Sequence, residues 1–450
     1  MVEHNGVTLQ MEVIPERLDE LRDILQKIVD EGVEDNHLVP FRQIDTAHYA
    51  RWVILGVGEF GKRRKRLPLQ LFYSASVDGP VDGHLEQLVE HGQSALDKIY
   101  PCCKGYPQDR TLNGTETLNY LKQHIISSTF YTGIVGVSLG RVHKEADLYT
   151  RIQKFLDGTQ KELQGLGPKE VREKIQFFVK SQPDLSWALK RDPFSFSTWM
   201  KIYGKLVRLV GILAFFVISG LIQLIGLLFA LPAILHIITL VGTAGLGIML
   251  IYVIGITLLM RIDELRSSAE GPTAPDDWIL KMQERETLIV QNQWSAGENI
   301  RNRSIRRVYQ KSFLWLVTQI SPIVFIPTVH AARWLQINNN RELAFFTNFD
   351  GTSEGYFHTF IDQLDIAKGI NMVFGSAKSF PITKWIRNRG AITNRSGYLR
   401  VIRSTQTITN VWYCAVKHLS VENIKNNKHV RRDLFGSLSV EKTEAWLRRF

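Results

Sequence analysis

The sequence predicts an α+β protein built from two similar halves, with a hydrophobic helical hairpin between them. One stretch, Leu209 to Met260, contains no Asp, Glu, Lys or Arg. It is about twice as long as the roughly 20 residues that cross a bilayer once. On either side of it, strand-like and helix-like patterns follow in the same order, and short blocks of sequence recur. These three observations together indicate a duplicated α+β chain interrupted by two membrane spans.

The charge-free stretch divides into two spans at a proline. We expect spans at Leu209 to Ala230 and Ile234 to Met260, with Pro232 at the turn because proline cannot continue the preceding helix. Basic residues flank the pair on both sides: Lys190, Arg191, Lys201, Lys205 and Arg208 before it, Arg261 and Arg266 after it. The positive-inside rule therefore predicts a multi-pass membrane protein with both termini on the cytoplasmic side.

Each half shows alternating and helical hydrophobic patterns in one order. In the first half the expected elements are a strand at 7–14, a helix at 15–31, strands at 46–55 and 69–77, a helix at 85–99 and a strand at 129–137. Strand, helix, strand, strand, helix, strand is the split βαβ or ferredoxin-like order. The sequence thus predicts a four-stranded sheet with helices on one face in each half.

The second half repeats blocks of the first. Thr46 to Trp52 matches Thr328 to Trp334, and the strand ending at Asp78-Gly79 matches the strand ending at Asp350-Gly351. Farther along, Phe130-Tyr131 matches Trp412-Tyr413, and Ser138 matches Ser420. Such ordered recurrence indicates an internal duplication. Because the bare face of one sheet must be buried, we expect the two repeats to pack sheet to sheet, as in a dimeric α/β barrel, with a ligand cavity between the sheets.

These patterns predict a division of the chain into five segments. Residues 1–157 form the first repeat, 158–204 a helical connector, 205–262 the transmembrane hairpin, 263–284 a linker, and 285–450 the second repeat with a C-terminal helix.

Composition limits the partners. The three cysteines suit a reducing compartment, and the net charge of +11 suits anionic lipid head groups beside a bilayer. The densest basic run, Lys62, Arg63, Arg64, Lys65 and Arg66, is expected at the membrane surface. Aromatic residues are not interleaved with these charges, so nucleic acid is not an expected partner. No zinc-ligand spacing is found, and the Gly-rich match at 56–61 lacks the helix that a phosphate loop needs.

The repeated strand block offers candidate binding residues. Alternation places His48 and Trp52 on one face of the strand and Arg51 on the other, and His330, Trp334 and Arg333 repeat this arrangement. The pattern leaves open which face is inward. One alternative is a packed His-Trp core; the other is a ligand site in which His48 or His330 binds a cofactor or transfers protons.

The duplicated arrangement with Asp-Gly after a strand resembles the superfamily of dye-decolourising peroxidases and chlorite dismutases, which bind haem in such a domain. That resemblance implies a distal acid-base role for Asp78 or Asp350 and a peroxide contact for Arg51 or Arg333. It also implies an iron ligand among His330, His358 and His418. The alternative for both aspartates is a helix N-cap. With its hairpin, the whole pattern resembles uncharacterised bacterial membrane proteins.

Two functional hypotheses follow. One is a binding or scaffold module at the cytoplasmic membrane face, with no assigned reaction. The other is a membrane-bound oxidoreductase that acts on a hydrophobic small molecule in the cavity between the sheets, with or without haem.

Overall fold

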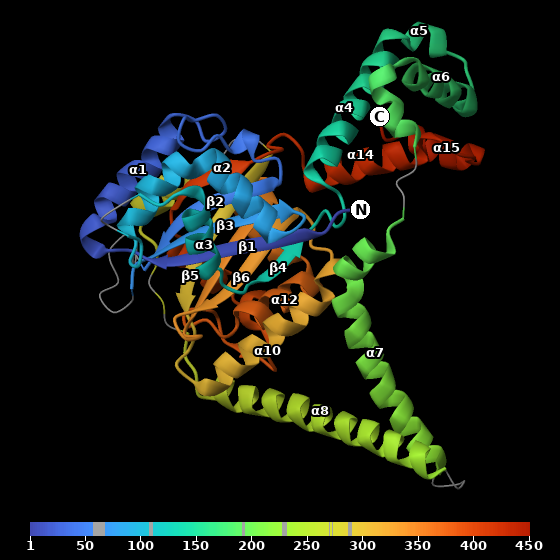
Figure 1. Cartoon of the computed structure of the whole chain (residues 1–450). Coiled ribbons are helices and arrows are strands. Elements are labelled where there is room, and N and C mark those ends of the chain that lie inside the picture. Colours follow the sequence, from blue (N-terminus) through green and yellow to red (C-terminus); the bar gives the residue numbers. More distant parts are fainter. Residues whose placement is uncertain are drawn as a thin grey trace.

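The computed structural model of the protein describes residues 1–56, 68–107, 111–190, 194–226, 232–269, 271, 273–286 and 290–450. The chain is a mixed α+β protein with two four-stranded antiparallel sheets (Figure 1). Two long apolar helices lie between the strand groups, as the sequence predicts.

The elements of each half follow the expected order, with additional helices. The first half contains β1 (His4–Glu12), α1 (Leu18–Asp30), β2 (Ala47–Leu55), β3 (Gln70–Asp78), α2 (Val81–Ile99), α3 (Gly114–Gln123) and β4 (Thr129–Thr132). The second contains β5 (Gln291–Asn299), α10 (Ser304–Ile320), β6 (Val329–Ile337), β7 (Glu342–Asp350), α11 (Ser353–Asp362), α12 (Leu364–Phe374), the short strands β8 (Thr383–Lys384) and β9 (Asn388–Arg389), α13 (Arg395–Thr405) and β10 (Thr409–Cys414).

The fourth strand of each half pairs with the other half. One sheet has the order β1-β3-β2-β10 and the other β4-β6-β7-β5. Phe130 in β4 pairs with Arg333 in β6, and Trp412 in β10 pairs with Arg51 in β2. The sequence predicts one self-contained sheet per half; the structure instead exchanges the last strand, so neither sheet is complete without both halves.

The segment before each exchanged strand still touches its own half. Ile125, just before β4, forms an antiparallel bridge with Leu9 in β1, and Gln406, just before β10, forms one with Ala296 in β5. Each fourth strand therefore runs from the edge of its own sheet to the edge of the other. The two sheets are linked at both edges by covalent chain.

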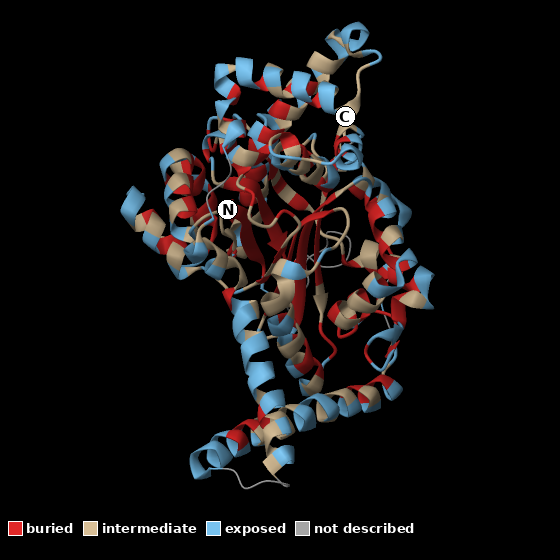
Figure 2. Ribbon diagram, turned by 90° about the vertical axis from the view of Figure 1, so that its right-hand side faces the viewer, coloured by how far each residue is buried: buried red, intermediate tan, exposed pale blue. Residues whose placement is uncertain are grey.

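Apolar side chains fill the space between the sheets. Those packed there are Val53, Leu55, Phe72, Leu335, Ile337, Ala344 and Phe346. The opposite face of each sheet is covered by the helices of its half, and the strands are the most consistently buried part of the chain (Figure 2).

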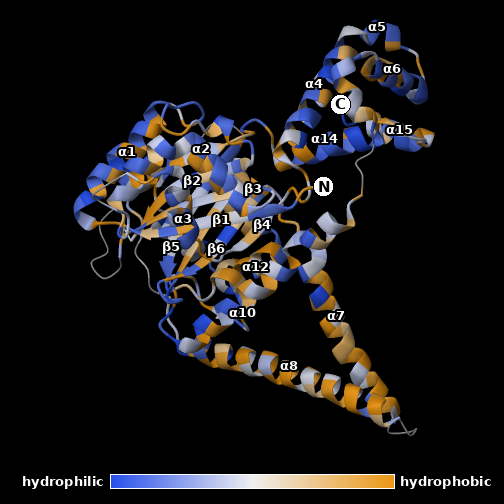
Figure 3. Ribbon diagram, viewed as in Figure 1, coloured by the Kyte–Doolittle hydropathy of each residue, from blue (hydrophilic) through white to orange (hydrophobic). Residues whose placement is uncertain are grey.

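The apolar helices α7 (Phe196–Gly226) and α8 (Ala233–Leu265) project from the strand body (Figures 1 and 3). Both are long and apolar enough to cross a membrane, and only 6% and 11% of their most hydrophobic windows are buried. A core helix of a soluble protein would be mostly buried. The helices cross closely at Gly242, where an added Cβ would lie 2.4 Å from Ser219 Cβ. Small residues permit such close contact between apolar helices.

A separate helical lobe joins sequence from both halves. It consists of α4 (Leu139–Gly158), α5 (Gln160–Leu163), α6 (Pro168–Ser181), α14 (Val421–Leu434) and α15 (Val440–Leu447). Ile152, Val179 and Trp446 share its core. Residues 158–190 of the predicted connector and the C-terminal helix are thus packed together, at the end of the molecule away from the tip of the hairpin (Figure 1). Residues 196–204, also predicted as connector, instead form the start of the apolar helix Phe196–Gly226.

Candidate functional site

The repeated histidines are each paired with the repeated aspartate of their own half. His48 Nε2 lies 2.9 Å from Asp78 Oδ1, and His330 Nε2 lies 2.6 Å from Asp350 Oδ1. Both imidazoles are buried. The sequence places these residues on neighbouring strands, and the register brings them together at the ends of β2–β3 and β6–β7.

The second oxygen of each aspartate binds the start of a helix in the lobe. Asp78 Oδ2 accepts from the amide of Leu139 at 2.7 Å, and Asp350 Oδ2 accepts from the amide of Val421 at 2.9 Å. These amides open α4 and α14, whose N-caps are Ser138 and Ser420. The expected capping of the helix directly after each aspartate is wrong, because Pro80 and Thr352 occupy those positions. The aspartates instead tie the lobe to the sheets.

The hydrogen-bond donors around Asp78 favour its ionised form. Burial opposes ionisation, but the bond from His48 and the amide of Leu139 outweigh it, and the pKa of Asp78 is lowered. Ionised Asp78 is therefore a hydrogen-bond acceptor for both partners rather than a free acid.

The two repeated arginines reach across the space between the sheets. Arg51 donates to the carbonyl oxygens of Trp294 at 2.9 Å and Thr347 at 3.0 Å in the other sheet. Arg333 donates to the carbonyl of Val7, and to that of Ala75 at 2.6 Å. The faces of β2 and β6 that carry the arginines thus lie between the two sheets, and the faces that carry the tryptophans pack against helices. The sequence had left open which of the two faces is inward.

The buried arginines act as crosslinks between the sheets. Burial lowers the pKa of Arg51 and of Arg333 to about 9, so both remain charged at neutral pH. Their donors are bound to main-chain and hydroxyl or amide oxygens, including Asn348 Oδ1 and Ser74 Oγ. Among the residues that the structure describes, both arginines line a cavity that is too small for a substrate.

The space between the sheets does not fit haem. The cavity beside Arg51 and Arg333 has a volume of about 10 Å³. Small-molecule sites have roughly 300–1,000 Å³. His48 and His330 already use Nε2 on their aspartates, and His358 and His418 are exposed. The expected ligand cavity between the sheets is therefore filled by protein.

One histidine–aspartate pair has a third potential metal ligand. His4 in β1 lies opposite Asp78, with Nδ1 3.6 Å from Asp78 Oδ1. Ligand atoms of His4, His48 and Asp78 all lie within 4.8 Å of one another, and burial lowers the pKa of His4 to about 3. In the second half Gln291 occupies the position of His4. Two imidazoles and one carboxylate can bind a divalent transition metal.

The second half contains an apolar pocket of about 390 Å³. It lies between the outer face of the sheet β4-β6-β7-β5 and the helices α10–α13. Aromatic and aliphatic side chains line most of it, among them Trp294, Phe313, Trp334, Phe345, Phe360 and Ile370. The volume is within the range of small-molecule sites.

The first half is closed at the corresponding place. Trp52, the counterpart of Trp334, is fully buried between Phe41 and Tyr73, with ring centroids 5.6 and 5.1 Å away. Trp334 and its neighbour Phe345 retain 7% and 8% exposure. The two halves thus differ in packing on this face. The sequence does not indicate the pocket, because its lining residues are of the same types as those of a solid core.

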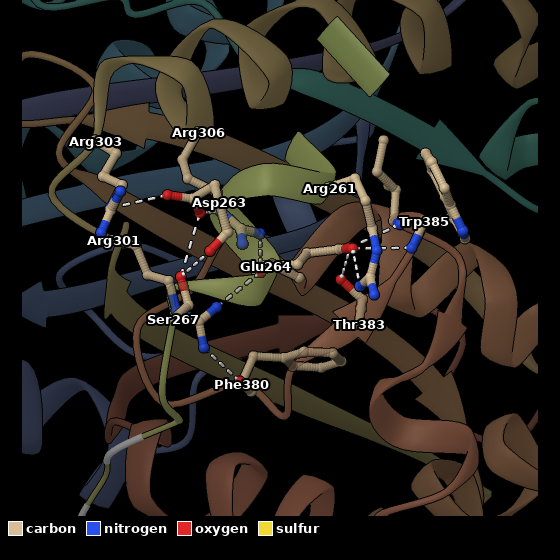
Figure 4. Close-up of polar contacts among 12 residues, drawn as sticks. Arg261, Asp263, Glu264, Ser267, Arg301, Arg303, Arg306, Phe380, Thr383 and Trp385 are labelled. Carbon is tan, nitrogen blue, oxygen red and sulfur yellow. Dashed lines mark hydrogen bonds and ion pairs between the residues drawn. The ribbon is translucent and has the colours of Figure 1, made fainter. Parts of the chain in front are cut away.

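The last turn of α8 is fixed to the second half by buried acids (Figure 4). Asp263 Oδ2 lies 2.5 Å from Arg306 Nε, and Asp263 Oδ1 lies 2.8 Å from Arg303 Nε. Glu264 accepts from the Thr383 hydroxyl at 2.6 Å and from the amide of Ile386 at 2.8 Å. The sequence predicts a linker from residue 263, whereas α8 continues to Leu265 and is bonded to the strand body.

The predicted membrane-surface run Lys62, Arg63, Arg64, Lys65 and Arg66 lies outside the described residues. Comparison of the chain with family models, curated proteins and solved structures finds no match. The resemblance to haem-binding α/β barrels therefore stays a prediction.

Proposed function

We propose that the protein is a membrane-anchored binding protein whose second half takes up an apolar small molecule. The observation that carries the proposal is the apolar pocket of about 390 Å³ on one half, where the other half is tightly packed. An open apolar volume costs stability through lost packing contacts, and a ligand would restore those contacts.

The place of the pocket favours a ligand from the bilayer. Helix α10 lies between the strand body and α8 (Figure 1). Its Phe313 lines the pocket and also packs against the cluster formed by Met260 of α8 and Tyr309. Exposed apolar side chains continue along this helix and the segment after it: Val308, Trp315, Leu316, Ile323 and Phe325. Phe325 itself lines the pocket, so an apolar surface continues from the hairpin to the pocket.

The arrangement of the chain supports the proposal that the protein is anchored in a membrane. A hairpin of two spans leaves both halves on one side, and the basic flanks favour the cytoplasmic side. We infer that the halves derive from one duplicated ferredoxin-like unit whose last strands were exchanged. In this reading the first half provides the scaffold and the second half the ligand pocket.

Photolabelling tests the proposal. Purified protein in uncharged detergent is exposed to an uncharged alkyl diazirine, and labelled peptides are identified by mass spectrometry. We expect labels on the exposed faces of α7 and α8, from the micelle, and additionally on the pocket segments 356–361 and 366–374, whose lining residues Phe357, Phe360 and Ile370 are buried.

The matched variants are Gly369→Phe and Gly83→Phe. Gly369 lines the pocket, and an added Cβ has no atom within 4 Å there or at Gly83 of α2. Gly369→Phe should remove labelling of the pocket segments while that of the hairpin persists; Gly83→Phe should change neither. Pocket segments that stay unlabelled in the unmodified protein, or are labelled equally in Gly369→Phe, would overturn the proposal.

A second candidate function is the binding of a divalent metal ion, in place of the haem that the resemblance implies. The observation that favours it is the third ligand, His4, beside His48 and Asp78. The second half has Gln291 at the position equivalent to His4, so His4→Gln introduces the residue type that the second half already carries there. If the unmodified protein retains one equivalent of a divalent metal after dialysis and His4→Gln retains none, this candidate is supported; equal metal contents would exclude it.

A further inference from the structure

A basic cleft lies where α8 meets the second half. It has a volume of about 690 Å³ and is lined by six basic side chains: Arg266, Arg301, Arg303, Arg307, Arg341 and Lys378. Among its lining residues that the structure describes, none is acidic. Arg301, Arg303 and Arg307 belong to one basic run that links β5 to α10. The other three come from the end of α8, the turn before β7 and the segment after α12, so the sequence shows only half of the cleft.

The cleft has a rigid main-chain frame. The amide of Ile300 donates to the carbonyl of Arg341 at 2.8 Å, and the amide of Lys378 donates to the carbonyl of Asn299 at 2.8 Å. The amide of Arg301 donates to the carbonyl of Ser376 at 2.9 Å. Main-chain bonds of this kind hold three of the segments that carry the charges in fixed positions.

Some of the charges are already bound, and some are not. Arg303 pairs with Asp263, and Arg301 donates to the carbonyls of Gly375 at 2.9 Å and Phe380 at 2.7 Å (Figure 4). Within the described part of the chain, Arg266, Arg341 and Lys378 make no side-chain hydrogen bond or ion pair. Like charges gathered without acids repel one another, and an anion between them removes that repulsion.

Arg301 and the start of α10 add positive charge beside the cleft. Arg301 is only 8% exposed, and its two terminal nitrogens donate to the carbonyls of Gly375 and Phe380. Helix α10 has Arg303 as its N-cap, with no capping side chain and no acid in its first turn. The free amides of a helix N-terminus favour a negative group.

We infer that this cleft binds a phosphate group carried by a small anion or by the head group of an anionic phospholipid. Arginine and helix amides are suited to phosphate oxygens. The cleft begins at Arg266, six positions after the last residue of the charge-free stretch, Met260, so a lipid head group at the end of the span is within reach. The inference rests on these charges and does not depend on the apolar pocket.

Calorimetry on the full-length protein in uncharged detergent tests the inference. One arm titrates inorganic phosphate, a second dihexanoyl phosphatidic acid, and a third dihexanoyl phosphatidylcholine, whose head group carries no net charge. We expect binding of at least one of the first two, and the tighter of them identifies the source of the phosphate. Raising the salt concentration to 0.5 M should weaken it because exposed charges are screened.

The matched variants remove three positive charges each. Arg266→Gln/Arg341→Gln/Lys378→Gln should weaken binding about tenfold or more, since each basic residue contributes to anion affinity. Lys161→Gln/Lys169→Gln/Lys174→Gln, exposed in the helical lobe, should not. The melting temperature of the cleft variant should be unchanged or higher, which shows that it is folded. The inference is overturned if neither anion binds or if both triple variants bind equally.

Discussion

Asp263 in the last turn of α8 lies 2.5 Å from Nε of Arg306 in α10, and both side chains are buried. This pair joins the base of the apolar hairpin to the helix that borders both the pocket and the basic cleft. Its loss leaves a buried guanidinium without its counter-charge. Breaking one side of a buried ion pair costs about 3–5 kcal/mol.

We therefore expect Asp263→Asn to lower the free energy of unfolding by about 3 kcal/mol. Chemical denaturation in detergent measures this change. Asp157→Asn, at an exposed carboxylate of α4, serves as the control and should change stability by less than about 0.5 kcal/mol. Equal stabilities for the two variants would show that α8 is not anchored by this carboxylate.

We expect the two repeated aspartates, Asp78 and Asp350, to contribute equally to the free energy of unfolding. Asp78→Ala and Asp350→Ala each remove the partner of a histidine and the acceptor for the first amide of a lobe helix, and each should cost about 2–3 kcal/mol. A double-mutant cycle of Asp78→Ala with His48→Ala should give an interaction energy above about 1 kcal/mol. Additive effects would mean that the two side chains do not interact.

The arginine crosslinks should not tolerate lysine. Arg51→Lys and Arg333→Lys keep the charge but lose the forked donors that bind several oxygens of the opposite sheet. We expect each to lower the free energy of unfolding by about 3 kcal/mol, from several lost bonds of about 1 kcal/mol each. Arg448→Lys, exposed near the C-terminus, is the control. A stability unaffected by Arg51→Lys would contradict the crosslinking role.

Stability should fall in mild acid because of His84. Its imidazole is fully buried, and burial, together with Arg333, lowers its pKa to about 3. Above the unfolded value of about 6.5 both states are neutral and this contribution is complete. As pH falls from 6.5 toward 3, only the unfolded chain takes up the proton, so stability decreases by about 1.4 kcal/mol per pH unit.

Denaturation at pH 7.5 and 5.5 checks this linkage. The difference in unfolding free energy between the two pH values should shrink by about 1.4 kcal/mol in His84→Gln relative to the unmodified protein. An identical pH dependence in the two proteins would mean that His84 takes up protons equally in both states.

The exchanged strands predict that a cut chain stays together. A protease site inserted after the exposed Gly165 separates β4 from the strands of the second half. Because β4 completes the second sheet and β10 the first, the fragments should co-elute in size-exclusion chromatography without denaturant. Fragments that separate would contradict the strand exchange.

The sequence predicted the elements better than their partners. Alternation around Arg51 and Trp52 correctly divided the strand into two faces, and the repeated blocks located the paired His48 and Asp78. Alternation carries no information on which strand lies beside which, so the pairing of Trp412 with Arg51 was not predictable. Nor could it show which face was inward, since both faces of β2 are buried.

The other features were hidden for different reasons. The pocket is lined by residues such as Phe345 that a solid core would also use. The basic cleft gathers charges from Arg266 to Lys378, far apart in sequence. A signal did exist for the anchor of α8: Asp263 and Glu264 are adjacent acids directly after the apolar stretch, where only exposed linker was expected.

The exchange of strands has a consequence for how the protein is made. The N-terminal sheet receives its final strand from β10, and Ile54 is bonded to Asn410, 356 residues farther along the chain. During synthesis this sheet keeps an open edge until nearly the whole polypeptide has left the ribosome, and the hairpin emerges before that edge is closed. An open strand edge invites pairing with other chains. A chaperone is therefore most needed during synthesis, while the N-terminal sheet still lacks β10.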